Sequence, residues 1–151
     1  GLLDPPSAAK AVPLASCSPS DWEVLLTTTN AIGTLVLPAA GNLDGCAAHS
    51  LSYTGQVLLI VRGTCAFATK TWHAYNAGAS IALIYDNIPY ASGTYPGLLT
   101  SIGTIQNPPI PAFMITQAEG SAMVTKLNNG NPLSVECSWS PLEFWFDQPS
   151  G

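Results

Sequence analysis

The stretch that decides the fold runs from residue 56 to residue 87, QVLLIVRGTCAFATKTWHAYNAGASIALIYDN. It opens with a continuous apolar run at Gln56–Val61, which is typical of a strand buried on both faces. Apolar residues at helical spacing predict a helix over Phe67–Ala77, closed by Gly78. The apolar run Ile81–Tyr85 predicts a second buried strand. Strand, helix and strand in about 30 residues form a βαβ unit, whose crossover should be right-handed.

Further strands and a second helix are expected outside this unit. Thr116 and Glu119 form a capping box that opens a helix, and the Asn- and Gly-rich residues 128–132 end it. Apolar spacing predicts that this helix buries Gly120, Met123, Val124 and Leu127. Strands are predicted at Trp22–Thr28, Ile32–Leu37, Ala112–Ile115 and Leu133–Trp139, with a turn at Asn30. The predicted fold class is mixed α/β (α+β).

The composition excludes several kinds of partner. The chain has 151 residues, the length of one domain, and 9% of them are charged, against about 25% in an ordinary soluble domain. The net charge is −5 with only four basic residues, too few for the basic patch that nucleic-acid binding needs. No apolar run approaches the roughly 20 residues of a membrane span. We therefore expect neither nucleic-acid binding nor direct membrane insertion.

Three segments are expected along the chain. Residues 1–20 are Pro- and Ser-rich and predict an extended entry segment, and residues 21–140 predict the folded domain. Residues 141–151 end in Pro-Ser-Gly, which is typical of the start of a linker. The sequence lacks an initiator Met, which predicts a piece processed or excised from a longer protein. Residues 86–111 carry five prolines and three glycines and predict a long loop, of the kind that is often functional.

The cysteines are Cys17, Cys46, Cys65 and Cys137. No pair has the CxxC spacing of a compact zinc site. An even number in a charge-poor chain favours two disulfides and an oxidising compartment. Three pairings are possible. We favour 46–65, which closes a short loop around one strand, and 17–137, which ties together the two ends of the domain.

Cys65 has a rival interpretation as a reactive thiol. It lies near Arg62 and just before the predicted helix, and both features lower the pKa of a thiol. Such a nucleophile needs a histidine base. His73 lies two turns along the helix, on a predicted polar face with Lys70 and Asn76, so a surface histidine is the default. No GxSxG or HExxH motif occurs, and we expect no catalytic residue, metal or cofactor.

Two stretches resemble the protease-associated (PA) domain family. One is LLIVRGTCAFATKTWHAYNAGASIALIYDN at 58–87, with an Arg-Gly-x-Cys-x-Phe turn between an apolar strand and a helix. The other is IPAFMITQAEGSAMVTKL at 110–127. Together they cover about a third of the chain, in the family's order and spacing. The chain is similar to the PA inserts of secreted subtilisin-like proteases and to the luminal PA domains of plant vacuolar sorting receptors.

The resemblance implies an open, sandwich-like β-barrel that contains the βαβ unit, is flanked by two main helices and has no catalytic residues of its own. It also implies that Cys46 pairs with Cys65. In the sorting receptors, the arginine that matches Arg62 contacts the backbone of a cargo peptide, which implies such a role for Arg62. The loop after Asp86 lacks the acidic residues common in the receptors, so the resemblance implies the fold more strongly than the ligand.

The candidate binding site lies at the ends of two predicted parallel strands, where open α/β sheets collect ligands. Its members are Arg62, Gly63, Thr64, Phe67, Asp86, Asn87, Tyr90 and Tyr95. Arg62 can bind a carboxylate or peptide carbonyls bidentately, or it can form an ion pair with Asp86 or Asp44. Asp86 and Asn87 can hold a peptide or Ca²⁺, or they can stabilise a turn. Tyr90 and Tyr95 offer an adaptable contact surface, or they cover the barrel.

These features predict a non-catalytic domain that recognises a protein or peptide and belongs to a larger extracellular or endomembrane protein. Its partner would be a peptide ligand or an adjoining domain of the parent chain. Two alternatives stay open. One is a lid that gates substrate entry to a linked subtilisin-like protease, and the other is a structural module of a cell-surface or matrix assembly.

Overall fold

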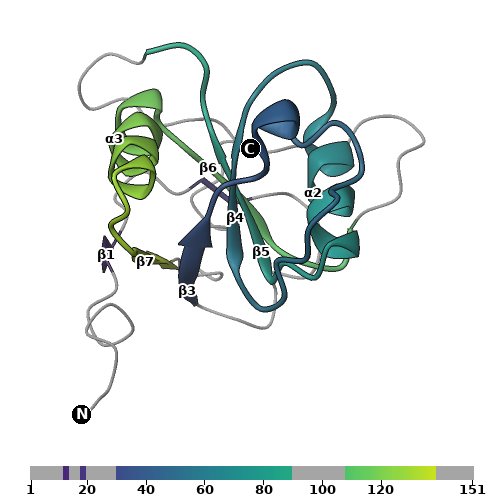
Figure 1. The fold of residues 1–151 in the computed structure, drawn as a ribbon, viewed down its shortest axis with the longest axis horizontal. Coiled ribbons are helices and arrows are strands. Elements are labelled where there is room, and N and C mark those ends of the chain that lie inside the picture. Colours follow the sequence, from purple (N-terminus) through teal and green to yellow (C-terminus); the bar gives the residue numbers. More distant parts are fainter. Residues whose placement is uncertain (1–11, 14–17, 20–29, 90–107, 139–151) are drawn as a thin grey trace, which may run out of the picture.

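The computed structural model describes residues 12–13, 18–19, 30–89 and 108–138, and in them a curled sheet lies between two helices (Figure 1). The strands are β1 (Val12–Pro13), β2 (Ser18–Pro19), β3 (Asn30–Val36), β4 (Val57–Val61), β5 (Ile81–Tyr85), β6 (Ala112–Ile115) and β7 (Ser134–Ser138). The helices are η2 (Ala40–Asn42, a 3₁₀ helix), α2 (Phe67–Asn76) and α3 (Gln117–Asn128).

The strands are ordered β1-β7-β3-β4-β5-β6-β2 in the sheet. From β3 to β6 each strand runs parallel to its neighbour, and β7 runs antiparallel to β3. The five longer strands form a curled half-barrel, with the predicted βαβ unit, β4-α2-β5, at its centre. The register pairs Val61 with Tyr85 and Tyr85 with Ile115. The carboxyl ends of β4, β5 and β6 therefore meet at one edge, which carries the candidate site.

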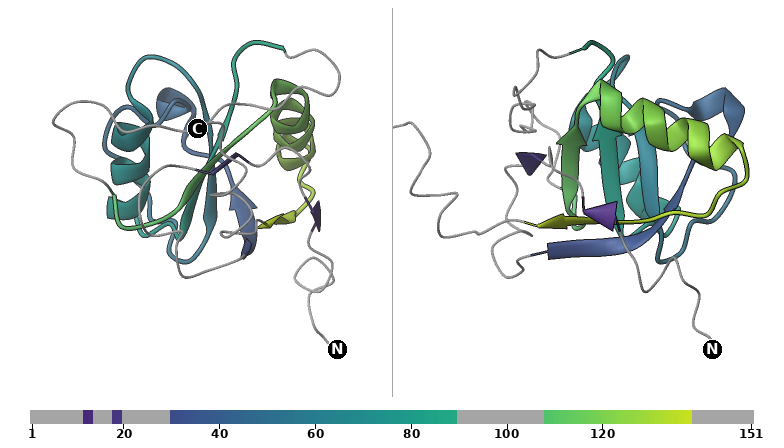
Figure 2. Two further views of the ribbon diagram at one scale, coloured as in Figure 1. Left: turned by 180° about the vertical axis from the view of Figure 1, so that it is seen from behind. Right: turned by 90° about the vertical axis from the view of Figure 1, so that its left-hand side faces the viewer.

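Each face of the sheet packs against one helix, because successive strand residues point to opposite faces. Figure 2 shows α2 and α3 on opposite sides of the sheet. The cluster beside α2 contains Tyr53, Leu58, Ile60, Ala68, Ala74, Ala79, Ala82, Ile84, Ala112 and Met114. The cluster beside α3 contains Leu35, Val57, Leu59, Ile81, Leu83, Phe113, Ile115, Met123, Val135 and Cys137. Burial on both faces explains why β4 and β5 have no polar alternation.

Most predicted elements in the described residues are confirmed. The predicted strands Ile81–Tyr85 and Ala112–Ile115 are β5 and β6. The turn predicted at Asn30 is wrong, because Asn30 begins β3 and pairs with Ser138 of β7. Pairing with a neighbouring strand outweighs the turn preference of a single Asn. The predicted strand at 22–28 lies outside the described residues.

Helix α3 begins as its capping box predicts. The Thr116 hydroxyl accepts from the Glu119 amide at 3.3 Å. On the predicted inner face Gly120 and Met123 are buried, while Val124 and Leu127 are partly buried against the same cluster.

Gly120 sets the approach of α3 to the sheet. A Cβ at this position would lie 2.2 Å from the Cβ of Tyr85, far inside van der Waals contact. The helix therefore crosses β5 at a position where it has no side chain.

Candidate recognition site

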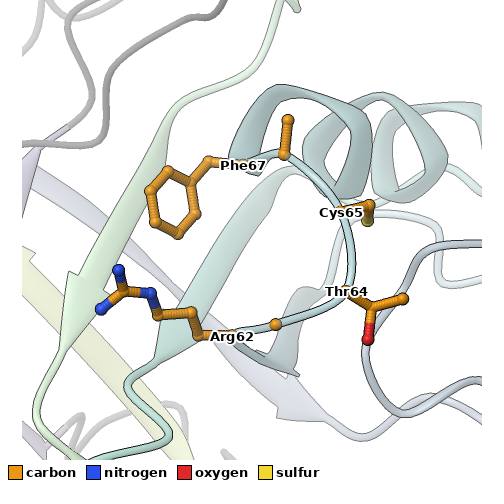
Figure 3. A pocket seen from close by; sticks show the side chains of 6 residues that line it. Arg62, Thr64, Cys65 and Phe67 are labelled. Atoms are coloured by element: carbon orange, nitrogen blue, oxygen red, sulfur yellow. The ribbon is translucent and has the colours of Figure 1, made fainter.

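The candidate site is the turn that joins β4 to α2, and it begins where the Arg62 amide donates to the Tyr85 carbonyl at 2.9 Å. An open pocket of about 330 Å³ is lined by Arg62, Gly63, Thr64, Cys65, Ala66 and Phe67. Figure 3 shows the Arg62 guanidinium and the Phe67 ring extending to the same side of the turn. A molecule at this edge of the sheet thus meets one cation and one aromatic ring.

Arg62 is held by an ion pair with Asp86, the first of the two predicted partners. Its Nη1 donates to the Asp86 carboxylate at 3.1 Å (Oδ1) and 3.3 Å (Oδ2). Asp86 is fully buried, whereas the Arg62 side chain is 40% exposed. The same carboxylate accepts from the backbone amides of Asn87 at 2.8 Å and Ile88 at 3.4 Å. These contacts satisfy a buried charge that would otherwise be very costly, and a Ca²⁺ ion at Asp86 would have to displace Arg62.

Phe67 fixes the guanidinium from a second side. Its ring centroid lies 5.6 Å from Cζ of Arg62, within the range of a cation–π interaction. Nε and Nη2 of Arg62 form no hydrogen bond to the described residues. The ion pair and the ring therefore orient the guanidinium and leave donors for a ligand.

The turn itself requires unusual backbone. Gly63 has φ +128°, and a Cβ there would lie 3.4 Å from Nδ2 of Asn87, so glycine suits the position. Thr64 has φ +75°, a region that β-branched residues rarely enter. Such a conformation persists only where the surroundings impose it. Two ties on either side of Thr64 supply that constraint.

The first tie is Lys70, which sequence reasoning missed. Its predicted place on a polar face is wrong, because the side chain is fully buried. Its Nζ donates to the carbonyls of Asp44 at 2.6 Å, Val61 at 3.0 Å and Gly63 at 2.6 Å. Three acceptors match the three protons of an ammonium, so Lys70 joins the loop before β4 to the end of β4 and to the turn. Burial lowers the pKa of Lys70, while the charge of Asp44 raises it.

The second tie is the disulfide Cys46–Cys65, which confirms the favoured pairing. The reactive-thiol interpretation of Cys65 is therefore wrong. Sγ of Cys46 lies 3.6 Å from Nζ of Lys70, so the covalent and the polar tie meet. The Asp44 carboxylate accepts from the Cys46 amide at 3.2 Å, and this hydrogen bond lowers the pKa of Asp44.

The structure brings together six of the eight predicted site residues. These are Arg62, Gly63, Thr64, Phe67, Asp86 and Asn87. Tyr90 and Tyr95 lie outside the described residues, and so does Cys17. The tyrosine surface and the Cys17–Cys137 pairing thus stay predictions, although Cys137 itself is buried.

A cluster of rings lies beside the loop that carries Asp44. The His49 ring meets Tyr53 edge-on at 5.5 Å and His73 at 6.5 Å between centroids, so His73 is not simply a solvated side chain. In the side-chain amide of Asn42, Nδ2 donates to the Ala47 carbonyl and Oδ1 accepts from the Ala47 backbone amide. Its Nδ2 therefore faces Nδ1 of His49 as the donor, at 3.1 Å, and that nitrogen carries no proton. Burial, and then the charge of His73, lower the pKa of His49.

Within the described ranges, no three His, Cys, Asp or Glu side chains gather as they would around a metal ion. None of the helices described is long and apolar enough to cross a membrane. The turn offers guanidinium donors and an aromatic face, which suit a carbonyl or carboxylate beside an apolar group.

Known proteins similar to this chain include sorting receptors and aminopeptidases. A family model described as PA domain matches residues 31–123. Vacuolar-sorting receptor 7 of Arabidopsis thaliana is 30% identical over 116 residues, which are 72% of this chain and 18% of the receptor. Probable leucine aminopeptidase 2 of Aspergillus fumigatus is 36% identical over 100 residues, 64% of this chain and 19% of that protein.

A solved structure has a related fold. The aminopeptidase from Aneurinibacillus sp. strain AM-1 superposes with a TM-score of 0.51 at 26% identity, over 72% of this chain and 25% of that one. The chain thus spans about a fifth of the length of the curated relatives it matches and a quarter of this structure.

Proposed function

This chain belongs to the PA domain family, and we propose that it is a non-catalytic recognition domain whose Arg62–Phe67 turn binds an extended peptide segment. The observation that carries the proposal is the Arg62 guanidinium, oriented by Asp86 and Phe67 with donors left over beside an open pocket. A planar guanidinium recognises carbonyl and carboxylate oxygens bidentately.

The charge and the rigidity of the site indicate which kind of ligand it favours. Asp86 offsets the charge of Arg62, so the site favours the neutral carbonyls of a peptide backbone over a free anion. The face of Phe67 takes an apolar side chain of the same peptide. Lys70 and the disulfide hold the turn in place before the ligand arrives, which reduces the ordering cost of binding.

The domain is proposed to work as part of a longer protein in an oxidising compartment, either outside the cell or in the lumen of the secretory system. The disulfide supports such a compartment, and relatives of this chain carry the name vacuolar-sorting receptor. The peptide is then a segment of a second protein or of a neighbouring domain of the parent chain.

A second candidate function is that of an accessory domain that gates substrate entry to a peptidase. The observation in its favour is the similarity to leucine aminopeptidases of two fungi. The parent peptidase is thus proposed to be an aminopeptidase in place of the subtilisin-like protease of the sequence prediction. The sequence that flanks this domain in the parent chain decides between the two functions, because a gating role requires a peptidase domain there.

The test is a selection from a random linear dodecapeptide library displayed on phage, followed by calorimetry with the enriched peptides. We expect Arg62→Ala to weaken their binding about tenfold or more, since one or two charge-assisted hydrogen bonds are lost. Lys126→Ala, at an exposed position of α3, is the control and should leave affinity unchanged.

The Arg62→Ala variant leaves Asp86 buried without its cation. The double variant Arg62→Ala/Asp86→Asn removes both charges, and an Asn oxygen can still accept from the amides of Asn87 and Ile88. Enriched peptides that bind this folded double variant as tightly as the original chain would contradict the proposal.

A further inference from the structure

We propose that the Cys46–Cys65 disulfide is a site of thiol exchange, at which an external thiol attacks Cys65 and expels Cys46 as a thiolate beside Lys70. The inference concerns a reaction of the turn, so it goes beyond peptide recognition. Its starting point is the difference between the surroundings of the two sulfur atoms.

The sulfur of Cys46 faces a buried cation. Nζ of Lys70 lies 3.6 Å from it, and Lys70 is fully buried. The carbonyl oxygens of Asp44 and Gly63 also lie near this sulfur, at 3.6 and 3.5 Å. Each of them accepts a hydrogen bond of 2.6 Å from the same Nζ, so their dipoles are already engaged. A thiolate formed at Cys46 would be a fourth partner of an ammonium held in place by three others.

Cys65 has different surroundings. Both cysteines are half-buried, but Cys65 lines the open pocket with Arg62 and Phe67 and Cys46 does not. In the described part of the chain no cation contacts the sulfur of Cys65. Exchange proceeds faster when the leaving thiol has the lower pKa, and a lysine beside a thiol lowers that pKa. The arrangement therefore favours attack at Cys65 with Cys46 as the leaving group.

The reaction balances with a thiol as the only co-reactant. A thiolate RS⁻ bonds to Sγ of Cys65, the Cys46–Cys65 bond breaks, and Cys46 keeps the electron pair as a thiolate. A second RSH then attacks the mixed disulfide and releases RSSR, which leaves two reduced cysteines. Two thiols are oxidised and one disulfide is reduced, so the reductant is a small-molecule thiol or a protein dithiol.

The consequence falls on the turn. Without the disulfide, the strained backbone of Thr64 loses one of its two ties, and the residues that present Arg62 relax. The exchange reaction is measured without any peptide ligand, so its failure would leave the proposed recognition function untouched.

The first experiment incubates the native chain with reduced glutathione, traps new thiols with iodoacetamide and maps both modifications by peptide mass spectrometry. The expected result is glutathione on Cys65 and carbamidomethyl on Cys46, in at least tenfold excess over the reverse pattern. Equal labelling of the two residues, the reverse pattern, or no reaction until urea unfolds the chain would each overturn the proposal.

A matched pair of variants tests whether Lys70 makes Cys46 the better leaving group. Cys65→Ser leaves the Cys46 thiol beside Lys70, and Cys46→Ser leaves the Cys65 thiol in the turn. Alkylation rates across pH should show about tenfold more thiolate at pH 7 for Cys46 than for an ordinary cysteine. The thiolate fraction of Cys65 should be smaller than that of Cys46. Lys70→Met in the Cys65→Ser background should abolish the excess. A Cys46 thiol that titrates like an ordinary cysteine would contradict the mechanism, and the mapping experiment stands on its own if a variant fails to fold.

Discussion

The two sides of the sheet both contain an apolar cluster, and they differ in the contacts that are added to it. On the α3 side, Gly120 lets the apolar face of the helix pack directly against Tyr85. On the α2 side, a buried lysine, a disulfide and an ion pair all act within the turn between residues 62 and 66 and its neighbours. Apolar packing builds both sides, and polar and covalent ties also shape the turn on the α2 side.

The difference shows that the position of the turn is fixed by directed bonds in addition to apolar burial. Apolar contacts stabilise a domain but specify the position of one guanidinium only loosely. Directed hydrogen bonds and a disulfide fix particular atoms. Tight local ties around an exposed arginine are what a preorganised recognition site needs.

Lys70→Met should have the largest effect on the turn side. Three carbonyls lose their shared donor, and we expect a loss of about 3–5 kcal/mol in the free energy of unfolding. Urea titration measures it, with Lys126→Met at an exposed position as the control, expected to change stability by less than about 0.5 kcal/mol. A loss below about 1 kcal/mol would mean that Lys70 is not a structural tie.

Replacing both Cys46 and Cys65 by Ala should cause the second-largest loss of stability. The bridge spans 19 residues of sequence, and the loss expected for a loop of this length is about 3 kcal/mol. Amide hydrogen exchange should speed up mainly at residues 62–66 and in the loop that carries Cys46. Uniformly faster exchange over both helices would show that the disulfide supports the whole fold and not the turn in particular.

Gly120→Ala tests the packed side. The new methyl group meets Tyr85, and overpacking of this kind costs about 2–3 kcal/mol. In contrast to the two turn variants, it should leave the affinity of a selected peptide unchanged within about twofold. Ser121→Ala, at the exposed neighbouring position, controls for helix propensity. An affinity lost in proportion to stability would erase the distinction between the two sides.

Lowering the pH should change the free energy of unfolding less than any of these substitutions. The pKa of His49 lies below its ordinary value of 6.5 in the folded chain, so the unfolded chain binds the proton more readily. The stabilising contribution is present above pH 6.5 and is lost as the pH falls below it. Solvent screening at this partly exposed ring keeps the loss below about 1 kcal/mol. Unfolding of the original chain and of His49→Gln at pH 7.5 and 5.5 checks this, and an equal pH dependence in both would contradict it.

The sequence predicts the parallel centre of the sheet because the apolar runs of β4, β5 and β6 need no tertiary information. It also predicts that Arg62 and Asp86 meet, since parallel strands end at one edge. The turn expected at Asn30 fails for the opposite reason. Only the distant partner Ser138 makes that residue part of a strand.

Lys70 could not be placed by charge, because lysine is usually exposed. The spacing of Lys70 from its apolar neighbours could have predicted its burial. It lies three residues after Phe67 and four before Ala74, so helical geometry puts it on their face. Which carbonyls would receive the ammonium depends on the loop before β4, and no local pattern in that loop reveals its path.

The most direct test of the account is a ¹H–¹⁵N correlation spectrum of the labelled chain, titrated with one library-selected peptide. If the Arg62 turn binds the peptide, the largest shift changes will fall at residues 62–67 and 86–88, and α3 will be almost unaffected. Changes centred on α3, or on any surface away from the Arg62 turn, would contradict it.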